Sequence, residues 1–167
     1  MKRLSKSIVM IVLLLIVAGP RSFACGDKFI LGSSGSQLER ATTAKHPGRI
    51  LVYREPNSET AAALKDPELD KYLKQAGHST RDADGPQDLQ YALGADRFDL
   101  VLVDYRAASR LRDQLVSKGL PIRVVPVLDR GSRQFLSAAK QEFKVVLNVP
   151  ASVSSVLTTI DKAMALH

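Results

Sequence analysis

The sequence predicts an α/β fold, a doubly wound five-stranded parallel sheet with helices on both faces. From residue 48 onward, short apolar runs alternate with amphipathic segments of helix length, the order typical of strands joined by helical crossovers. The run Phe98-Asp99-Leu100-Val101-Leu102-Val103 is almost continuously apolar, as expected of a strand buried on both faces of a parallel sheet. Gly77, Gly94 and Gly119 follow helical segments, where helices commonly end.

The first half of this domain is expected to supply two strands and two helices. Arg49–Tyr53 is a short apolar strand, and Ser58 can cap the helix that follows it. Pro67 kinks or splits that helix, because its ring nitrogen cannot donate to the preceding turn. His78–Asp82 is predicted as a weak, polar strand. Pro86 then stands near the start of a short helix, a position that tolerates proline.

The second half alternates more regularly between apolar strands and amphipathic helices. After the strand at Phe98–Val103, the pattern predicts a helix at Ala107–Lys118, a strand at Pro121–Leu128, a helix at Ser132–Gln141, a strand at Lys144–Leu147 and a helix at Ser152–Ala165. Because crossovers between parallel strands are right-handed, these helices are expected to cover both faces of the sheet.

The first 24 residues predict a secretory signal peptide. A basic start precedes Ile8–Ala18, a run without a polar side chain, and Ser22-Phe23-Ala24 supplies small residues at the two positions that a leader peptidase recognises. The apolar run is too short to span a bilayer, which needs about 20 residues. The protein is therefore expected to be exported, to the periplasm or beyond the cell.

Cys25 is the only cysteine and would be the first residue of the mature chain. This position suits a lipid anchor, but Ser22 stands where lipoprotein signals usually carry an aliphatic residue. Two interpretations stay open, a lipid-anchored protein and a soluble one with a free terminal thiol. Residues 25–47 are expected to form a lead-in or linker before the domain at residues 48–167.

Composition and motifs argue against several classes of function. The predicted signal peptide contains four Lys or Arg residues and no acid, so its removal lowers the formal net charge from +7 to +3. No cluster of basic and aromatic residues indicates nucleic-acid binding. His46, His78 and His167 lack metal-ligand spacing and are expected on the surface. No Gly-x-Ser-x-Gly motif is present, and the protein is not expected to be an enzyme.

The order of these elements resembles the receiver domain of two-component response regulators. The matching segments are Arg49–Tyr53 for the first strand, Phe98–Asp104 for the third, Leu120–Val125 for the fourth and Val146–Pro150 for the last. The resemblance covers Gly48–His167 and implies a flavodoxin-like sandwich. It also implies a cis peptide at Val149-Pro150, a step that is commonly cis in receivers.

The resemblance places Asp104 where receivers carry the phosphorylated aspartate, but most of the accompanying groups are replaced. The two acids that hold magnesium correspond to Arg54 and Glu55, the hydroxyl position to Pro126 and the lysine position to Val149. Metal and lysine normally offset the charge of the transferring phosphoryl group. With two of the five groups left, and no ATP pool outside the cytoplasm, we expect a pseudo-receiver that has lost phosphorylation of Asp104.

Three uses of this acidic edge stay open. Glu55, Asp104 and Asp129 are expected to converge at the carboxyl ends of the strands, where open α/β sheets bind ligands. Arg54 is expected to pair with Asp104 and fix the site without a metal. Alternatively, Glu55 and Asp104 hold a divalent cation such as Mg²⁺, which accepts oxygen ligands, or the side chains are solvated and idle.

The resulting functional expectation is an exported, non-catalytic interaction or signalling module whose partner is another exported or membrane protein. The membrane itself is a partner only if Cys25 is lipidated. The receiver resemblance implies a partner surface made of Ser132–Gln141, Lys144–Leu147 and Ser152–Ala165. The alternatives are a small-ligand or metal sensor at Glu55 and Asp104, and an active receiver phosphorylated on Asp104.

Overall fold

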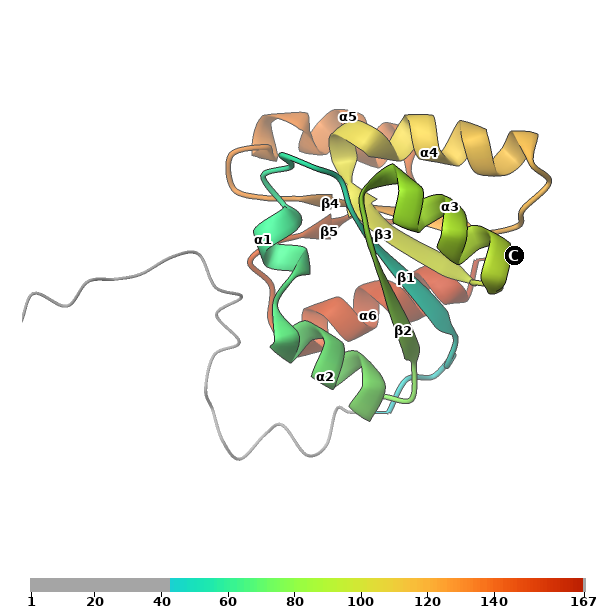
Figure 1. Ribbon diagram of the computed structural model, residues 1–167. Helices are drawn as coiled ribbons and strands as arrows, with labels where there is room; N and C mark the ends of the chain where they lie inside the picture. Colours follow the sequence, from blue (N-terminus) through green and yellow to red (C-terminus); the bar gives the residue numbers. More distant parts are fainter. Residues whose placement is uncertain (1–42, 167) are drawn as a thin grey trace, which may run out of the picture.

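The computed structural model describes residues 43–166, which form one parallel sheet of five strands in the order β2-β1-β3-β4-β5 (Figure 1). The strands are β1 (Arg49–Arg54), β2 (Ser79–Asp84), β3 (Leu100–Asp104), β4 (Arg123–Leu128) and β5 (Leu147–Asn148). The helices are α1 (Ala61–Leu64), α2 (Pro67–Gln75), α3 (Gly85–Ala95), α4 (Tyr105–Ser117), α5 (Leu136–Glu142) and α6 (Val153–Met164), with a 3₁₀ turn η2 at Arg133–Phe135. This strand order is the flavodoxin-like one, so the predicted fold class is confirmed.

The predicted signal peptide, Cys25 and most of the predicted lead-in lie outside the described residues. Within residues 43–166, no helix combines the length and apolar character needed to cross a membrane.

The sheet separates two hydrophobic clusters because side chains alternate between its faces. In β1, Ile50 and Val52 belong to the cluster beneath α2 and α6, whereas Leu51 and Tyr53 belong to the cluster beneath α3 and α4. All five residues of β3 are buried. The continuous apolar run therefore predicted correctly that this strand is central and covered on both sides.

Several element boundaries differ from the sequence prediction for identifiable local reasons. Pro67 does split the first helical region, since Asp66 accepts the Glu68 N–H at 2.9 Å and starts a new helix. Ser58, however, does not cap α1, because its hydroxyl is used elsewhere. Gly94 lies inside α3, which continues to Ala95, so it is not the stop that the sequence predicted.

The last strand is also shorter and later than predicted. Only Leu147 and Asn148 pair with β4, whereas Lys144 is exposed and outside the ladder. Val145 is buried in the core without pairing as a strand residue. Its apolar side chain produced a strand-like pattern in the sequence although its backbone lies outside the sheet.

Candidate functional site

Asp104 is the last residue of β3, and its carboxylate is surrounded by neutral hydrogen-bond donors. One oxygen, Oδ1, accepts the backbone N–H of Arg106 at 2.8 Å and caps α4. The other, Oδ2, accepts the Ser58 hydroxyl at 2.7 Å and the Thr60 hydroxyl at 2.8 Å. Asp104 is 5% exposed and Thr60 is 0% exposed. The carboxylate is therefore closed off from solvent by groups of its own chain.

The loop between β1 and α1 provides both hydroxyls. Asn57 has a positive φ of 62°, a conformation that asparagine adopts more readily than most residues. This turn is closed by the Ser58 N–H, which donates to the Glu55 carbonyl at 3.2 Å. The Ser58 and Thr60 hydroxyls lie 2.9 Å apart, and the Thr60 N–H donates to the Ser58 hydroxyl at 3.2 Å. Asp104 thus pins this loop to the start of α4.

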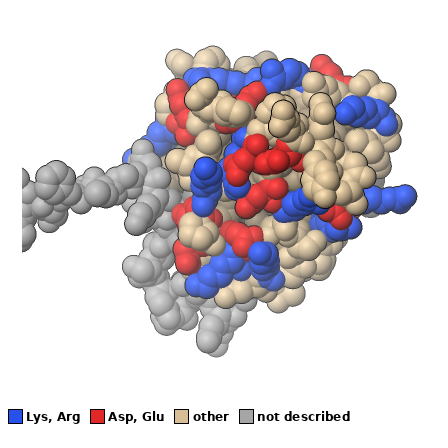
Figure 2. Space-filling view, in the orientation of Figure 1, with Lys and Arg blue, Asp and Glu red and all other residues tan. Residues whose placement is uncertain are grey.

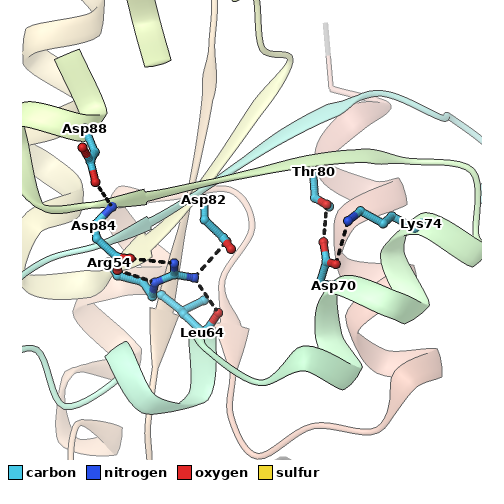
Figure 3. Close-up of polar contacts among 8 residues, drawn as sticks. All are labelled: Arg54, Leu64, Asp70, Lys74, Thr80, Asp82, Asp84 and Asp88. Carbon is cyan, nitrogen blue, oxygen red and sulfur yellow. Dashed lines mark hydrogen bonds and ion pairs between the residues drawn. The ribbon is translucent and has the colours of Figure 1, made fainter. Parts of the chain in front are cut away.

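Arg54 does not pair with Asp104, so that prediction was wrong. Its guanidinium instead binds two aspartates of the neighbouring strand β2 (Figure 3). Nε and Nη2 donate to the two Asp84 oxygens at 2.7 and 3.1 Å, and Nη1 lies 2.8 Å from Asp82 Oδ1. The register pairs Arg54 with Asp84. Residues 82 and 84 share one face of β2, so both carboxylates flank the guanidinium.

The ion-pair cluster joins a buried arginine to two exposed aspartates at the sheet edge. Arg54 is only 8% exposed, whereas more than half of each aspartate side chain is open to solvent. The hydrogen bond from Arg54 is the main reason why the pKa of Asp84 lies below its usual value. Figure 2 shows acidic side chains gathered at the centre of this face of the molecule.

The remaining acids of the predicted site have partners of their own. Glu55 forms an ion pair with Arg110 of α4, and Asp129 accepts the Ser132 N–H at 2.8 Å. Glu55 and Asp104 therefore do not share a ligand position. Across the described residues, no group of three or more His, Cys, Asp or Glu side chains could hold a metal ion.

The positions that the resemblance assigns to the receiver hydroxyl and lysine are apolar and buried. Pro126 pairs with Val103, and Val127 stands opposite Asp104, so neither residue offers a hydroxyl to the site. Val149 is also buried and offers no cation. The peptide bond between Val149 and Pro150 is cis, as predicted.

A cavity of about 690 Å³ lies between α3 and α4, next to Glu55 but not Asp104. The residues that line its apolar part are Tyr53, Leu89, Leu93, Leu111 and Leu115. Burial, and then the nearby charge of Glu55, raise the pKa of Tyr53. Glu55 and Arg110 both line this cavity, and the Glu55 carboxylate is already paired with the Arg110 guanidinium.

The surface that the resemblance implies for a partner is mostly polar. The outer face of α6 exposes Ser154, Ser155, Thr158 and Lys162. Among the large apolar residues that are exposed in the described part, Phe135 alone belongs to this surface; the others are Tyr91 and Val116. Phe135 stacks on Tyr105 with ring centroids 5.9 Å apart, which concentrates the apolar contact area near the start of α4.

The sequence predicted that all three histidines lie on the surface, and for His78 this prediction was wrong. His46 is exposed, but His78 is buried at 4% exposure, and His167 lies outside the described residues. The Nδ1 of His78 accepts the Gly48 N–H at 3.2 Å where the chain enters the domain.

Comparison of the chain with protein families, with curated proteins and with solved structures gave no match.

Proposed function

We propose that this protein is a non-catalytic, receiver-like module that acts outside the cytoplasm by binding another protein. The observation that carries the proposal is the closed hydrogen-bond network around Asp104. Its two oxygens accept three hydrogen bonds from Ser58, Thr60 and the Arg106 N–H.

This arrangement opposes phosphoryl transfer to Asp104. A phosphoryl group brings negative charge to a carboxylate, so transfer requires cations that offset it. Hydroxyls are neutral, and Arg54 is committed to Asp82 and Asp84. The attacking oxygen would also have to give up its hydrogen bonds, to the Arg106 N–H if it is Oδ1 and to the two hydroxyls if it is Oδ2. The network supports a structural role for Asp104, which joins the β1–α1 loop to α4.

We define the Phe135 surface as Arg133, Gln134 and Phe135 of the predicted partner face together with Tyr105 of α4, on which Phe135 stacks, and we propose it as the binding surface. Aromatic residues and arginine contribute most of the energy in many protein interfaces. Phe135 is partly exposed while stacked on Tyr105, and Arg133 and Gln134 are exposed beside it. Because Phe135 is already stacked on Tyr105, binding a partner there would cost less side-chain entropy than ordering a free aromatic ring.

Export is supported by the sequence, through the basic start, apolar run and small residues that precede Cys25. An exported domain has no access to the cytoplasmic kinases that phosphorylate receivers. The proposed compartment and the closed Asp104 site therefore agree with each other.

Loss of phosphorylation can be tested with magnesium and beryllofluoride, a phosphoryl mimic, added to the chain from Cys25. We expect no change in melting temperature, because Asp104 is already hydrogen-bonded and forms no ion pair with a lysine or arginine among residues 43–166. A rise that needs both additives and disappears in Asp104→Asn would show that the acidic site is active.

Binding can be tested by photo-crosslinking in the cells that export the protein. A crosslinking side chain would replace Gln134 of the Phe135 surface, and the exposed Gln114 of α4 would provide the matched control position. We expect one discrete protein adduct from position 134, which a Phe135→Ala substitution weakens. Adducts from position 114 alone would contradict the proposed surface.

A further inference from the structure

The chain enters the domain through a short segment that uses all its backbone donors. We call residues 44–48 the strap. Ala44 N–H donates to the Ala76 carbonyl at 2.9 Å, and the N–H groups of Lys45 and His46 donate to Asp161 Oδ1 at 2.9 and 3.1 Å. Gly48 N–H donates to His78 Nδ1 at 3.2 Å. Because Pro47 has no N–H, every donor of the strap has an acceptor.

The contact between Gly48 and His78 fixes the state of the imidazole. A ring nitrogen that accepts a hydrogen bond carries no proton, so the neutral ring has its proton on Nε2. Among the described residues, Nε2 has no hydrogen-bond partner although it is buried. The site therefore accommodates a neutral His78, and the nitrogen that would take up a second proton, Nδ1, faces the Gly48 N–H and not an acceptor.

Nearby charges offset only part of the effect of burial on the pKa of His78. Burial is the main influence and holds the pKa of His78 below its usual value of 6.5, whereas Asp161 acts in the opposite direction. The Gly48 N–H donates to Nδ1, and this contact favours the neutral ring because only an unprotonated nitrogen can accept it. The charged or titratable groups on the surrounding elements are Lys45 and His46 of the strap, Arg49, Tyr53 and Arg54 of β1, Arg81, Asp82 and Asp84 of β2, Asp99 before β3, Glu68, Asp70, Lys71, Tyr72 and Lys74 of α2, and Asp161 and Lys162 of α6.

We propose that His78 makes the strap an acid-sensitive latch, which holds the incoming chain against the domain at neutral pH and releases it in mild acid. Protonation turns Nδ1 from an acceptor into a donor, so the imidazole N–H would face the Gly48 N–H. It would also place a positive charge in a buried site. Both effects favour the state in which the strap has separated and His78 is hydrated.

The direction of the pH dependence follows from linkage. The detached state binds a proton more readily than the latched state, because the Gly48 N–H requires an unprotonated Nδ1 only when the strap is in place. The latch is therefore at full strength above about pH 6.5 and weakens as the pH falls below that value. At about pH 5.5, one unit below the ordinary pKa, opening is favoured by up to about tenfold.

Release would change how the domain is connected to the chain that precedes it. Five freed residues can extend by up to about 17 Å, which would let the domain move away from whatever holds its N-terminal side. An exported protein experiences the pH of its surroundings, so this response would be used in the compartment that we propose.

The test is amide hydrogen exchange of the chain from Cys25 at about pH 7.5 and about pH 5.5, corrected for intrinsic exchange rates. We expect protection of the Gly48 and Ala44 amides to fall by up to about tenfold in acid. The Leu102 amide in β3 should keep its protection, which distinguishes local release from unfolding. Unchanged protection of the strap would overturn the proposal.

Two variants assign the effect to the correct histidine. His78→Asn keeps a neutral acceptor near the position of Nδ1 and should remove the pH dependence, whereas His46→Asn on the same strap should retain it. The same fall in His78→Asn would overturn the proposal. In the unmodified protein, an NMR titration of the His78 ring must give a pKa below 6.5, with the Gly48 amide shift following it. A higher pKa or an indifferent Gly48 amide would also refute the latch, whether or not the variants fold.

Discussion

Replacing Thr60 with valine is expected to lower the free energy of unfolding by about 2 kcal/mol, because a hydrogen bond to a charged group contributes about 1.5–3 kcal/mol. Thr60 is 0% exposed, and its hydroxyl donates to Asp104 Oδ2 at 2.8 Å. Water cannot readily replace that donor. Valine has nearly the same shape as threonine, so no cavity contributes to the loss.

The partly exposed Ser58 provides the matched comparison. Its hydroxyl makes a hydrogen bond of similar length to the same oxygen, but solvent can partly replace it in Ser58→Ala. We expect a loss of about 1 kcal/mol there, in the range for an ordinary hydrogen bond. Equal losses in the two variants would indicate that the burial of Thr60 does not strengthen its bond.

Urea unfolding followed by circular dichroism measures both losses, and a double-mutant cycle with Asp104→Asn identifies their origin. A neutral amide accepts a weaker hydrogen bond than a carboxylate, so Thr60→Val should cost about 1 kcal/mol less in that background. The reasoning is refuted if Thr60→Val costs less than about 0.5 kcal/mol or shows no coupling to Asp104.

Three further predictions concern the sheet edge, the glycines and the N-terminus. Arg54→Met should reduce the free energy of unfolding by about 1–2 kcal/mol at pH 7, because it leaves two like charges together on β2. Urea unfolding should show a smaller loss in acid below the pKa of Asp84, because there the protonated Asp84 no longer forms the ion pair in the unmodified protein. Gly77→Ala should cost about 1 kcal/mol because φ is +100°, whereas Gly94→Ala inside α3 should be neutral or stabilising, since nothing lies within 4 Å of the added methyl; thermal unfolding of the pair compares them. Intact mass spectrometry of the exported chain should show that it begins at Cys25, and retention of the first 24 residues would contradict the signal peptide.

The fold could be predicted from the sequence because burial leaves a direct signal in the order of residue types. The Phe98–Val103 run has an apolar side chain on each face of its strand, which only a central strand of a covered sheet requires. Pro67 similarly marks a boundary by chemistry that no tertiary contact can override. Gly94 shows the limit of such signals, because glycine is permitted at a helix end but is also tolerated within a helix.

The partner of Arg54 could not be predicted from local sequence because it depends on which strands are neighbours. The Asp82-Ala83-Asp84 pattern presents two carboxylates on one face of a strand, but only the register between β1 and β2 places them beside Arg54. Parallel strands separated by a helix leave that register unspecified in the sequence. The expectation of an arginine–carboxylate pair was correct in its chemistry but assigned the wrong aspartate.

Ser58 and Thr60 were missed as ligands of Asp104 for a related reason. Serine after a strand was interpreted as a helix cap, its commonest use. Asp104 competes for that hydroxyl once β1 and β3 are adjacent. One signal in the sequence could have been used. Ser58 and Thr60 are two hydroxyl residues in the loop after β1, the strand next to β3, which ends at Asp104.

The two ends of the sheet differ in how acid can act on them. At the carboxyl end, Arg54 holds the pKa of Asp84 below its usual value, so mild acid leaves this ion pair in place. At the amino end, His78 accepts a hydrogen bond from Gly48 through Nδ1, the nitrogen on which the proposed latch depends. If the proposed latch operates, the response to acid begins where the chain enters the fold. That places a control point next to the segment that connects the domain to Cys25, the residue on which anchoring would depend.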